Sequence, residues 1–263
     1  MDFTNKVCVV TGGALGIGRC MTQEFAKLGA KVAFVDMNEA AGKENLELIQ
    51  KAGGEAFFFH GNIGEEQVLR DFVQEVVSVY GSVDYLINNA CLTRGGILNK
   101  CRYDLFNYVL QVGVTAPYFL TLLFLPHFNP GASIVNIAST RAFQSQPNTE
   151  SYTAAKGGIL ALTHALAASL AGKVRVNCIS PGWIDTGEYY DASYVPNHSE
   201  ADRLQHTVKR IGHPMDIVRA VLFLCSDENS FINGQNLIVD GGMSTLMIYH
   251  GDHGWTYTPE DDV

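Results

Sequence analysis

Ser139, Tyr152 and Lys156 carry side chains that could together move a proton. Tyr152 and Lys156 are four residues apart, so on a helix they lie on one face. An ammonium next to a phenol stabilises the phenolate and lowers a pKa that is ~10 in water, so we expect Tyr152 to act as a general acid and base near neutral pH. Ser139 follows an apolar stretch, where its hydroxyl could hold a substrate oxygen in place. A Tyr-Lys pair alone is commonly an exposed helix face, so its meaning depends on the motifs around it.

Residues 11–18 form a glycine-rich turn, TGGALGIG, between a β-branched run and a helical pattern. In that position the glycines let backbone N–H groups at the start of the helix approach a pyrophosphate. The alternative is a tight strand–helix turn that binds nothing. Its place in the first strand–helix unit of the chain favours a dinucleotide-binding turn.

Asp36 ends the next strand-like run, about 20 residues beyond the glycines, which is where a carboxylate accepts hydrogen bonds from an adenosine ribose. The same carboxylate would repel a 2′-phosphate, and the following residues, Met37 and Asn38, offer no cation to attract one. A helix N-cap is the alternative role for Asp36. The pattern predicts NAD as the cofactor and disfavours NADP.

The elements that must position these residues alternate along the chain. Seven short strand-like runs are separated by longer stretches with apolar residues at three- and four-residue steps. Such alternation predicts a doubly wound α/β fold, a seven-stranded parallel sheet with helices on both faces. The expected strands are residues 6–10, 31–36, 56–60, 83–88, 133–138, 174–179 and 237–240.

No repeat or low-complexity linker divides the chain, so we expect a single domain over residues 1–243. Within it, residues 186–213 interrupt the alternation after a strand end and are predicted to form a substrate lid. Residues 244–263 form a carboxyl-terminal tail. We expect the end of that tail to be solvated and the part around Trp255 and Tyr257 to pack on something.

The formal net charge of −9 and the absence of a Lys/Arg cluster argue against nucleic acid as a partner. The N-terminus does not read as a secretory signal, and the longest apolar run, residues 118–125, is far shorter than the ~20 residues of a membrane span. Six scattered cysteines, several in apolar runs, fit a reducing cytoplasm. Residues 250–253, HGDH, lack the further ligands and the spacing of a metal site, so we expect no metal.

These motifs and three further ones, taken in order, resemble a single-domain, NAD(H)-dependent member of the short-chain dehydrogenase/reductase family, whose fold is the Rossmann fold. The resemblance covers residues 4–243. It rests on residues 11–18, Asn88-Asn89-Ala90, Ser139, Tyr152-Thr153-Ala154-Ala155-Lys156, Ser180-Pro181-Gly182 and Val239-Asp240-Gly241-Gly242.

The resemblance implies that Tyr152 gives or takes the proton, Lys156 binds the nicotinamide ribose and tunes Tyr152, and Ser139 orients the carbonyl. It places Asn62 and Ile63 beside the adenine. Asn89 and Ala90 would lie against the adenosine ribose. The full implied cofactor set is Gly12, Leu15, Gly16, Ile17, Gly18, Asp36, Asn62, Ile63, Asn89, Ala90, Tyr152, Lys156, Pro181, Gly182, Ile184 and Thr186.

Three positions depart from the family pattern. Asn62 stands where Asp is usual, and its amide can still bond adenine. Cys91 replaces the Gly after Asn-Asn-Ala, and we expect it to be a buried small hydrophobe more readily than a redox group. Gly113 replaces the Asn whose backbone kinks a helix and positions a water next to the lysine. A glycine permits the same kink and leaves room for water, so we expect activity to survive.

The expected reaction moves a hydride between nicotinamide C4 and the carbinol carbon of a secondary alcohol. Aromatic residues that line or flank the lid would give the substrate pocket flat walls suited to a steroid, cyclic alcohol or polyol; they are Trp183, Tyr189, Tyr190 and Tyr194. An acyl-carrier-protein substrate is disfavoured, because such partners are acidic like this chain and Asp36 disfavours NADP. Arg94 and Arg141 leave a carboxylate-bearing substrate open.

Two other functions remain open at this point. An NADH-binding sensor with weak or no turnover would explain Gly113 and Cys91, although it leaves the intact Ser139, Tyr152 and Lys156 set without a purpose. A sugar-nucleotide epimerase uses the same triad but usually needs a larger substrate domain. The resemblance also implies a homotetramer or homodimer, and the Ala- and Leu-rich run 159–171 is compatible with a buried helix face between subunits.

Overall fold

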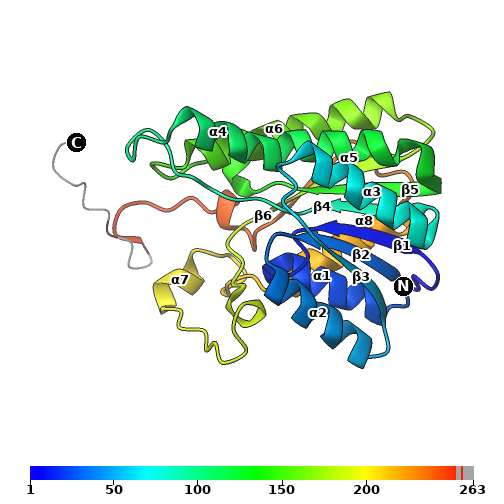
Figure 1. Ribbon diagram of the computed structural model, residues 1–263. Coiled ribbons are helices and arrows are strands. Elements are labelled where there is room, and N and C mark those ends of the chain that lie inside the picture. The colour runs from blue at the N-terminus through cyan, green and yellow to red at the C-terminus, as the bar shows by residue number, and fades with distance from the viewer. Residues whose placement is uncertain (253–255, 257–263) are drawn as a thin grey trace.

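A computed structural model describes residues 1–252 and 256. Seven strands form one parallel sheet in the order β3-β2-β1-β4-β5-β6-β7, which confirms the expected sheet (Figure 1). The order reverses direction between β1 and β4, so a crevice opens there at the carboxyl ends of the strands. The strands are β1 Val7–Thr11, β2 Lys31–Asp36, β3 Glu55–His60, β4 Val83–Asn88, β5 Phe128–Ile137, β6 Arg175–Pro181 and β7 Asn236–Val239.

β5 begins at Phe128, five residues before the expected start at residue 133. The Asn-Pro-Gly sequence at 129–131 reads as a turn, which is why this part was not predicted. In the structure Phe128 pairs with Val83, and the register with β4 shifts before Tyr85. The added residues extend the strand away from the end that carries the site.

Helices cover both faces of the sheet (Figure 1). Alternate strand residues face the two layers, so that Cys8 and Val10 pack on one side and Val7 and Val9 on the other. The first layer contains α1 Gly16–Lys27, α2 Glu39–Lys51 and α8 Pro214–Cys225. The second contains α3 Glu66–Tyr80, α4 Tyr103–Leu110, α5 Ala116–Phe124 and α6 Glu150–Ser169, and a short helix, α7 Glu200–Leu204, lies apart from both.

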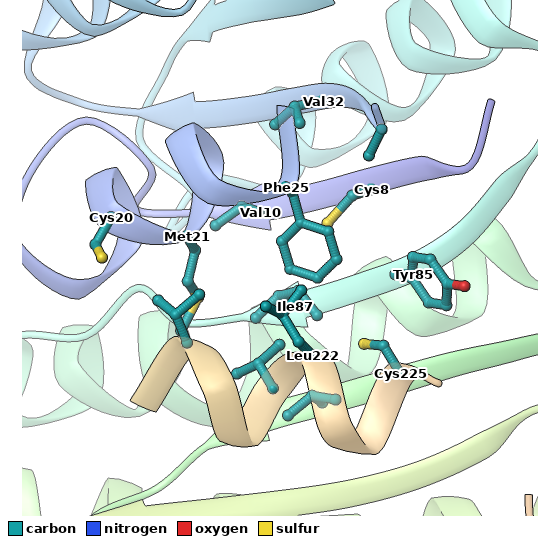
Figure 2. Packing of buried hydrophobic residues seen from close by; sticks show 14 of the residues in the cluster. Cys8, Val10, Cys20, Met21, Phe25, Val32, Tyr85, Ile87, Leu222 and Cys225 are labelled. Carbon is teal, nitrogen blue, oxygen red and sulfur yellow. The ribbon is translucent and has the colours of Figure 1, made fainter. Parts of the chain in front are cut away.

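The first layer is held by aromatic and sulfur-containing side chains (Figure 2). Phe25 of α1 is fully buried and its ring lies 5.2 Å from that of Phe3 and 6.1 Å from that of Tyr85. Burial of one such ring contributes about 1.5–3 kcal/mol. Cys20 is buried in the same layer, and burial raises the pKa of its thiol to about 11. Cys8 and Cys225 are buried in this layer too. The three thiols therefore act as small hydrophobes, as predicted for the cysteines in apolar runs.

α4 and α5 are joined by a π-helical turn, Gln111–Thr115, with Gly113 at its centre. A π-helical turn is one of the irregularities at which helices kink, so the turn stands where the kink is expected. The continuous helical stretch Tyr103–His127 has the length of a membrane span, and an 18-residue window within it has a mean hydropathy of 1.6, which the short apolar run did not reveal. Its best window is 44% buried in this fold, and apolar core helices share that composition.

The predicted lid, residues 186–213, contains a short 3₁₀ turn, Gly187–Tyr189, and α7. Its ends are brought together by a β-bridge between Ile184 and Gly212. The tail begins with a further 3₁₀ turn, Met243–Thr245. The expectations for the packing of the tail and for the HGDH motif depended partly on three residues that lie outside the described part of the chain: His253, Trp255 and Tyr257.

Candidate active site

The glycine-rich turn joins β1 to α1 at the switch point of the sheet. Gly12 and Gly16 have φ angles of 67° and 57°, which other residues rarely adopt. At Gly12 a Cβ would lie 2.9 Å from the Cα of Ala90, so the turn also packs tightly on the end of β4. α1 begins at Gly16 with no side-chain cap and no acidic residue in its first turn. The free N–H groups and positive end of this 12-residue helix suit a diphosphate.

A groove of about 480 Å³ runs along this edge of the sheet. Most of the predicted cofactor residues line it, namely Gly12, Leu15, Gly16, Ile17, Asp36, Asn62, Ile63, Asn89, Ala90 and Thr186. Gly18 is instead buried behind the turn, where a Cβ would lie 1.9 Å from the carbonyl oxygen of Gly12. The expectation that Gly18 lines the cofactor site is therefore wrong, because this glycine serves the close packing of α1 on the turn.

Asp36 closes one end of the groove at the tip of β2. Its carboxylate accepts hydrogen bonds from the backbone N–H groups of Ala14, at 3.1 Å, and Asn38, at 2.9 Å. The alternative N-cap role belongs to Asn38, whose side chain accepts from Ala41 at the start of α2. Asp36 is thus a fixed carboxylate facing the groove.

Tyr108 is a groove residue that the sequence reasoning missed. Its hydroxyl donates to Asn62 Oδ1 at 2.9 Å, so α4 fixes the amide that stands where the family usually has Asp. Val112, four residues later, lines the same groove. The four-residue spacing was a signal that the two share a helix face, but nothing in it indicated which face met the cofactor.

A second cavity, of about 160 Å³, continues from the first and contains the predicted catalytic residues. Ser139 follows β5, and Tyr152 and Lys156 project from the first turns of α6. Ser139 and Tyr152 line this cavity together, and Lys156 Nζ lies 5.4 Å from the centre of the Tyr152 ring. Pro181, Gly182 and Ile184 line the opposite wall. The structure therefore brings together all three residues that are 13 and 4 apart in sequence.

The ionisation of Tyr152 differs from the expectation. Burial raises the pKa of its phenol above the usual value, and the opposing effect of the Lys156 ammonium does not offset this. The Lys156 pKa is also raised, because Cys91 and Tyr152 outweigh the opposing effect of burial. Lys156 lowers the pKa of Tyr152, as predicted. The prediction that this effect outweighs the others is wrong, because burial raises the pKa by more. Without cofactor, Tyr152 carries its proton at neutral pH.

Ser151, next to Tyr152, ties α6 to a loop that comes from β4. Its side chain is fully buried, accepts from the backbone N–H of Arg94 at 3.3 Å and donates to the carbonyl oxygen of Gly95 at 2.7 Å. Asn148 accepts from the N–H of Gly96 at 3.0 Å. Arg94 therefore stands at a fixed place on the wall of the groove, 57 residues from Ser151 in sequence.

Two of the departures from the family pattern involve glycine: Cys91 stands where the family has Gly, and Gly113 stands where it has Asn. Cys91 is exposed and lines both cavities, so the expectation of a buried hydrophobe is wrong. Cys91 follows β4 at the place where the two cavities meet. Gly113 lies in the π-helical turn, and a Cβ there would lie 2.9 Å from that of Ala155 on α6. The absence of a side chain at Gly113 thus allows the π-helical turn to pack closely on α6.

The lid aromatics do not form the expected pocket walls. Tyr189 packs into the first core layer beside α1, and Trp183 stands between the rings of His198, at 5.8 Å, and His206, at 6.2 Å. Tyr190 lies over Gly16 in the cofactor groove. None of these three lines the catalytic cavity, because their rings lie against the first core layer, two histidines and the glycine-rich turn.

Comparisons with known proteins agree with this arrangement. A family model described as enoyl-(acyl carrier protein) reductase matches residues 12–244. An uncharacterized oxidoreductase of Thermotoga maritima is 42% identical over 93% of this chain and 98% of its own length. A 3-oxoacyl-[acyl-carrier-protein] reductase of the same organism is 32% identical over 92% of this chain and 99% of its own.

Among solved structures, an apo SCOR enzyme from Clostridium thermocellum superposes with a TM-score of 0.88 at 42% identity, covering 98% of this chain and 100% of that one. Family members bind a nicotinamide cofactor, NAD(H) or NADP(H). With the match over nearly the whole chain, the seven-stranded fold and the matching site, the protein belongs to the short-chain dehydrogenase/reductase family of oxidoreductases.

Proposed function

We propose that the protein is an NAD(H)-dependent enzyme that interconverts a secondary alcohol and a ketone. One observation carries this proposal. The cluster of Ser139, Tyr152 and Lys156 lies in the same crevice as the groove that ends at Asp36. The two cavities share Ile17, Asn89 and Cys91, so a dinucleotide along the groove would have its reactive end at the cluster.

The residues of the cavity have separate tasks in this proposal. The nicotinamide, when bound, supplies or accepts the hydride. The Ser139 hydroxyl holds the substrate oxygen next to that of Tyr152, and Tyr152 gives the oxygen a proton in ketone reduction or takes it in alcohol oxidation. The buried Lys156 ammonium, which donates to the carbonyl oxygen of Ile137 at 2.7 Å, stabilises the phenolate left after proton donation.

NAD is proposed over NADP because of Asp36. Its carboxylate is held by two backbone N–H groups and remains in the groove where an adenosine ribose would lie. A 2′-phosphate there would meet a like charge. The same feature, with a net charge of −9, weighs against the acyl-carrier-protein substrates in the names of some relatives. Steroid, cyclic alcohol and polyol substrates remain the proposed classes.

The test is oxidation of NADH in the presence of a panel of steroid, cyclic, sugar-derived and small aliphatic ketones, with NADPH in parallel. We expect turnover with at least one ketone and a preference for NADH of at least about tenfold, the factor that corresponds to ~1.4 kcal/mol. Tight NADH binding without turnover across the panel would favour the alternative, a dinucleotide sensor. A preference for NADPH would remove the role given to Asp36.

We also propose a homodimer or homotetramer that uses α6. Its outer face carries small exposed residues, Ala161, Ala165 and Ala168, which would let a second copy approach closely. Light scattering of the protein is expected to give two or four chains, and a monomer would contradict this. All six cysteines, which lie in the described part of the chain, are free, in keeping with the proposed reducing cytoplasm.

A further inference from the structure

Tyr190, which directly follows the 3₁₀ turn of the lid, has its ring in the cofactor groove. A Cβ built at Gly16 would lie 3.3 Å from a carbon of this ring and 3.4 Å from its hydroxyl oxygen. Both residues line the groove, and neither lines the catalytic cavity. The ring therefore covers the space that the absent side chain of Gly16 leaves open.

That space is the one a diphosphate needs. Gly16 is the first residue of α1, and a glycine at such a place in a dinucleotide-binding turn lets the diphosphate approach the backbone N–H groups of the helix N-terminus. No side chain caps α1, and its first turn holds no acidic residue, so these N–H groups are left for a ligand. The Tyr190 ring and a bound diphosphate would thus compete for the same place.

The lid turn is fixed at its base and loose at its tip. Asp185 accepts from the N–H of Gly187 at 3.0 Å, and Glu188 pairs with His213. Tyr190 is 61% exposed, and its N–H donates to the carbonyl oxygen of Gly187 at 2.9 Å. Within the described part of the chain its hydroxyl has no hydrogen-bond partner. The ring can therefore leave the groove by rotation of its side chain while the turn stays in place.

From this geometry we infer that Tyr190 is an autoinhibitory residue, whose ring occupies the diphosphate site and must be displaced when a dinucleotide binds. The apparent affinity of a ligand falls in proportion to the fraction of molecules whose site is open, so a ring in place about nine-tenths of the time weakens binding about tenfold. The inference depends on the nicotinamide cofactor of the family. It is independent of the proposed ketone substrate and of the choice between NAD and NADP.

Two fragments of the cofactor test this without turnover. ADP carries the diphosphate, whereas adenosine has only the base and ribose. By calorimetric titration we expect Tyr190→Ala to bind ADP with a Kd about three- to tenfold lower than the unaltered protein does, and adenosine with a Kd within about twofold. A Kd for ADP that is unchanged or higher would overturn the inference, as would ADP binding to neither protein. An equal gain for adenosine would place the ring over the other end of the groove and overturn it too.

The rates of NADH binding separate a ring that blocks the site from one that clamps the cofactor. In stopped-flow fluorescence we expect Tyr190→Ala to raise kon about three- to tenfold and to leave koff within about twofold, because the open fraction limits association. A higher koff with an unchanged kon would mean that the ring holds the bound cofactor, and the inference would fall.

Two variants serve as controls. Tyr190→Phe keeps the ring, so its Kd for ADP should stay within about twofold of that of the unaltered protein. Tyr103→Ala removes a tyrosine that is 85% exposed and lines neither cavity, and it should have no effect. A gain in Tyr190→Phe as large as that in Tyr190→Ala would contradict the role of the ring. Melting temperatures of all variants exclude a change in folding as the cause.

The outcomes separate this inference from the proposed function. If the unaltered protein reduces no ketone, the proposed function fails while the ADP titration still decides the role of Tyr190. If it reduces ketones and Tyr190→Ala binds ADP no more tightly, the autoinhibitory role fails and the proposed function stands.

Discussion

The catalytic floor, formed by Ser139, Tyr152 and Lys156, and the lid over residues 186–213 are built by different means. Ser139 and Lys156 are 8% and 3% exposed and are fixed by a strand end and a long helix. The lid is held by pairs near the surface, such as Glu188 with His213, whose side chains are about half exposed. Pairs of that kind contribute little, whereas buried polar groups must be satisfied. The floor therefore tolerates few changes and the lid many.

The largest effect should come from the floor. Tyr152→Phe removes one hydroxyl from the catalytic cavity, and kcat is expected to fall about 10²- to 10⁴-fold, the usual contribution of a general acid or base. NADH binding, followed by fluorescence titration, should persist because the ring remains. Turnover within tenfold of the unaltered protein would mean that another group moves the proton.

The ionisation of Tyr152 should be visible as a pH dependence. Since burial raises its pKa, the phenol is protonated at neutral pH, and alcohol oxidation needs it deprotonated. We expect kcat/KM for oxidation to rise with pH by up to about tenfold per unit from pH 7 to 9, while ketone reduction stays nearly flat. Oxidation that does not change over this range would contradict the assignment of Tyr152 as the base.

A pair of glycines tests the packing behind the floor. Gly113→Ala would place a Cβ 2.9 Å from that of Ala155 and should lower the free energy of unfolding by about 1–3 kcal/mol. Gly157→Ala, on α6, meets open space in the single chain and should raise it by up to about 1 kcal/mol. Urea denaturation measures both. Equal effects would show that the approach of α6 to the π-helical turn is looser than described.

The smallest effect should come from the lid. Tyr194→Phe removes a hydroxyl that donates to Asp185 Oδ2 at 2.9 Å, a contact close to solvent. It is the counterpart of Tyr152→Phe, and we expect kcat and KM to stay within about threefold. A loss of kcat like that of Tyr152→Phe would place the lid in the chemistry and end the distinction between the two regions.

The same contrast explains what could be predicted from the sequence. The strand–helix alternation and the spacing of Ser139, Tyr152 and Lys156 follow local rules, so both the sheet and the cluster were predicted correctly. The exposure of Cys91 depends on the path of the chain after β4, and the position of Tyr108 depends on how α4 packs along the groove. Neither follows from local sequence. The lid aromatics were misplaced because their packing on α1 and on two histidines is a tertiary choice that no periodicity encodes.

The attachment of the loop after β4 to α6 has a consequence for how such an enzyme can change. The Ser151 hydroxyl bonds the backbone of Arg94 and Gly95, so these hydrogen bonds do not depend on the Arg94 side chain. Substitutions at residue 94 can thus alter what the wall presents to a ligand while the position of Tyr152 is preserved. Variation of substrate preference is in this way separated from the reaction itself, which makes residue 94 a suitable first position for directed evolution.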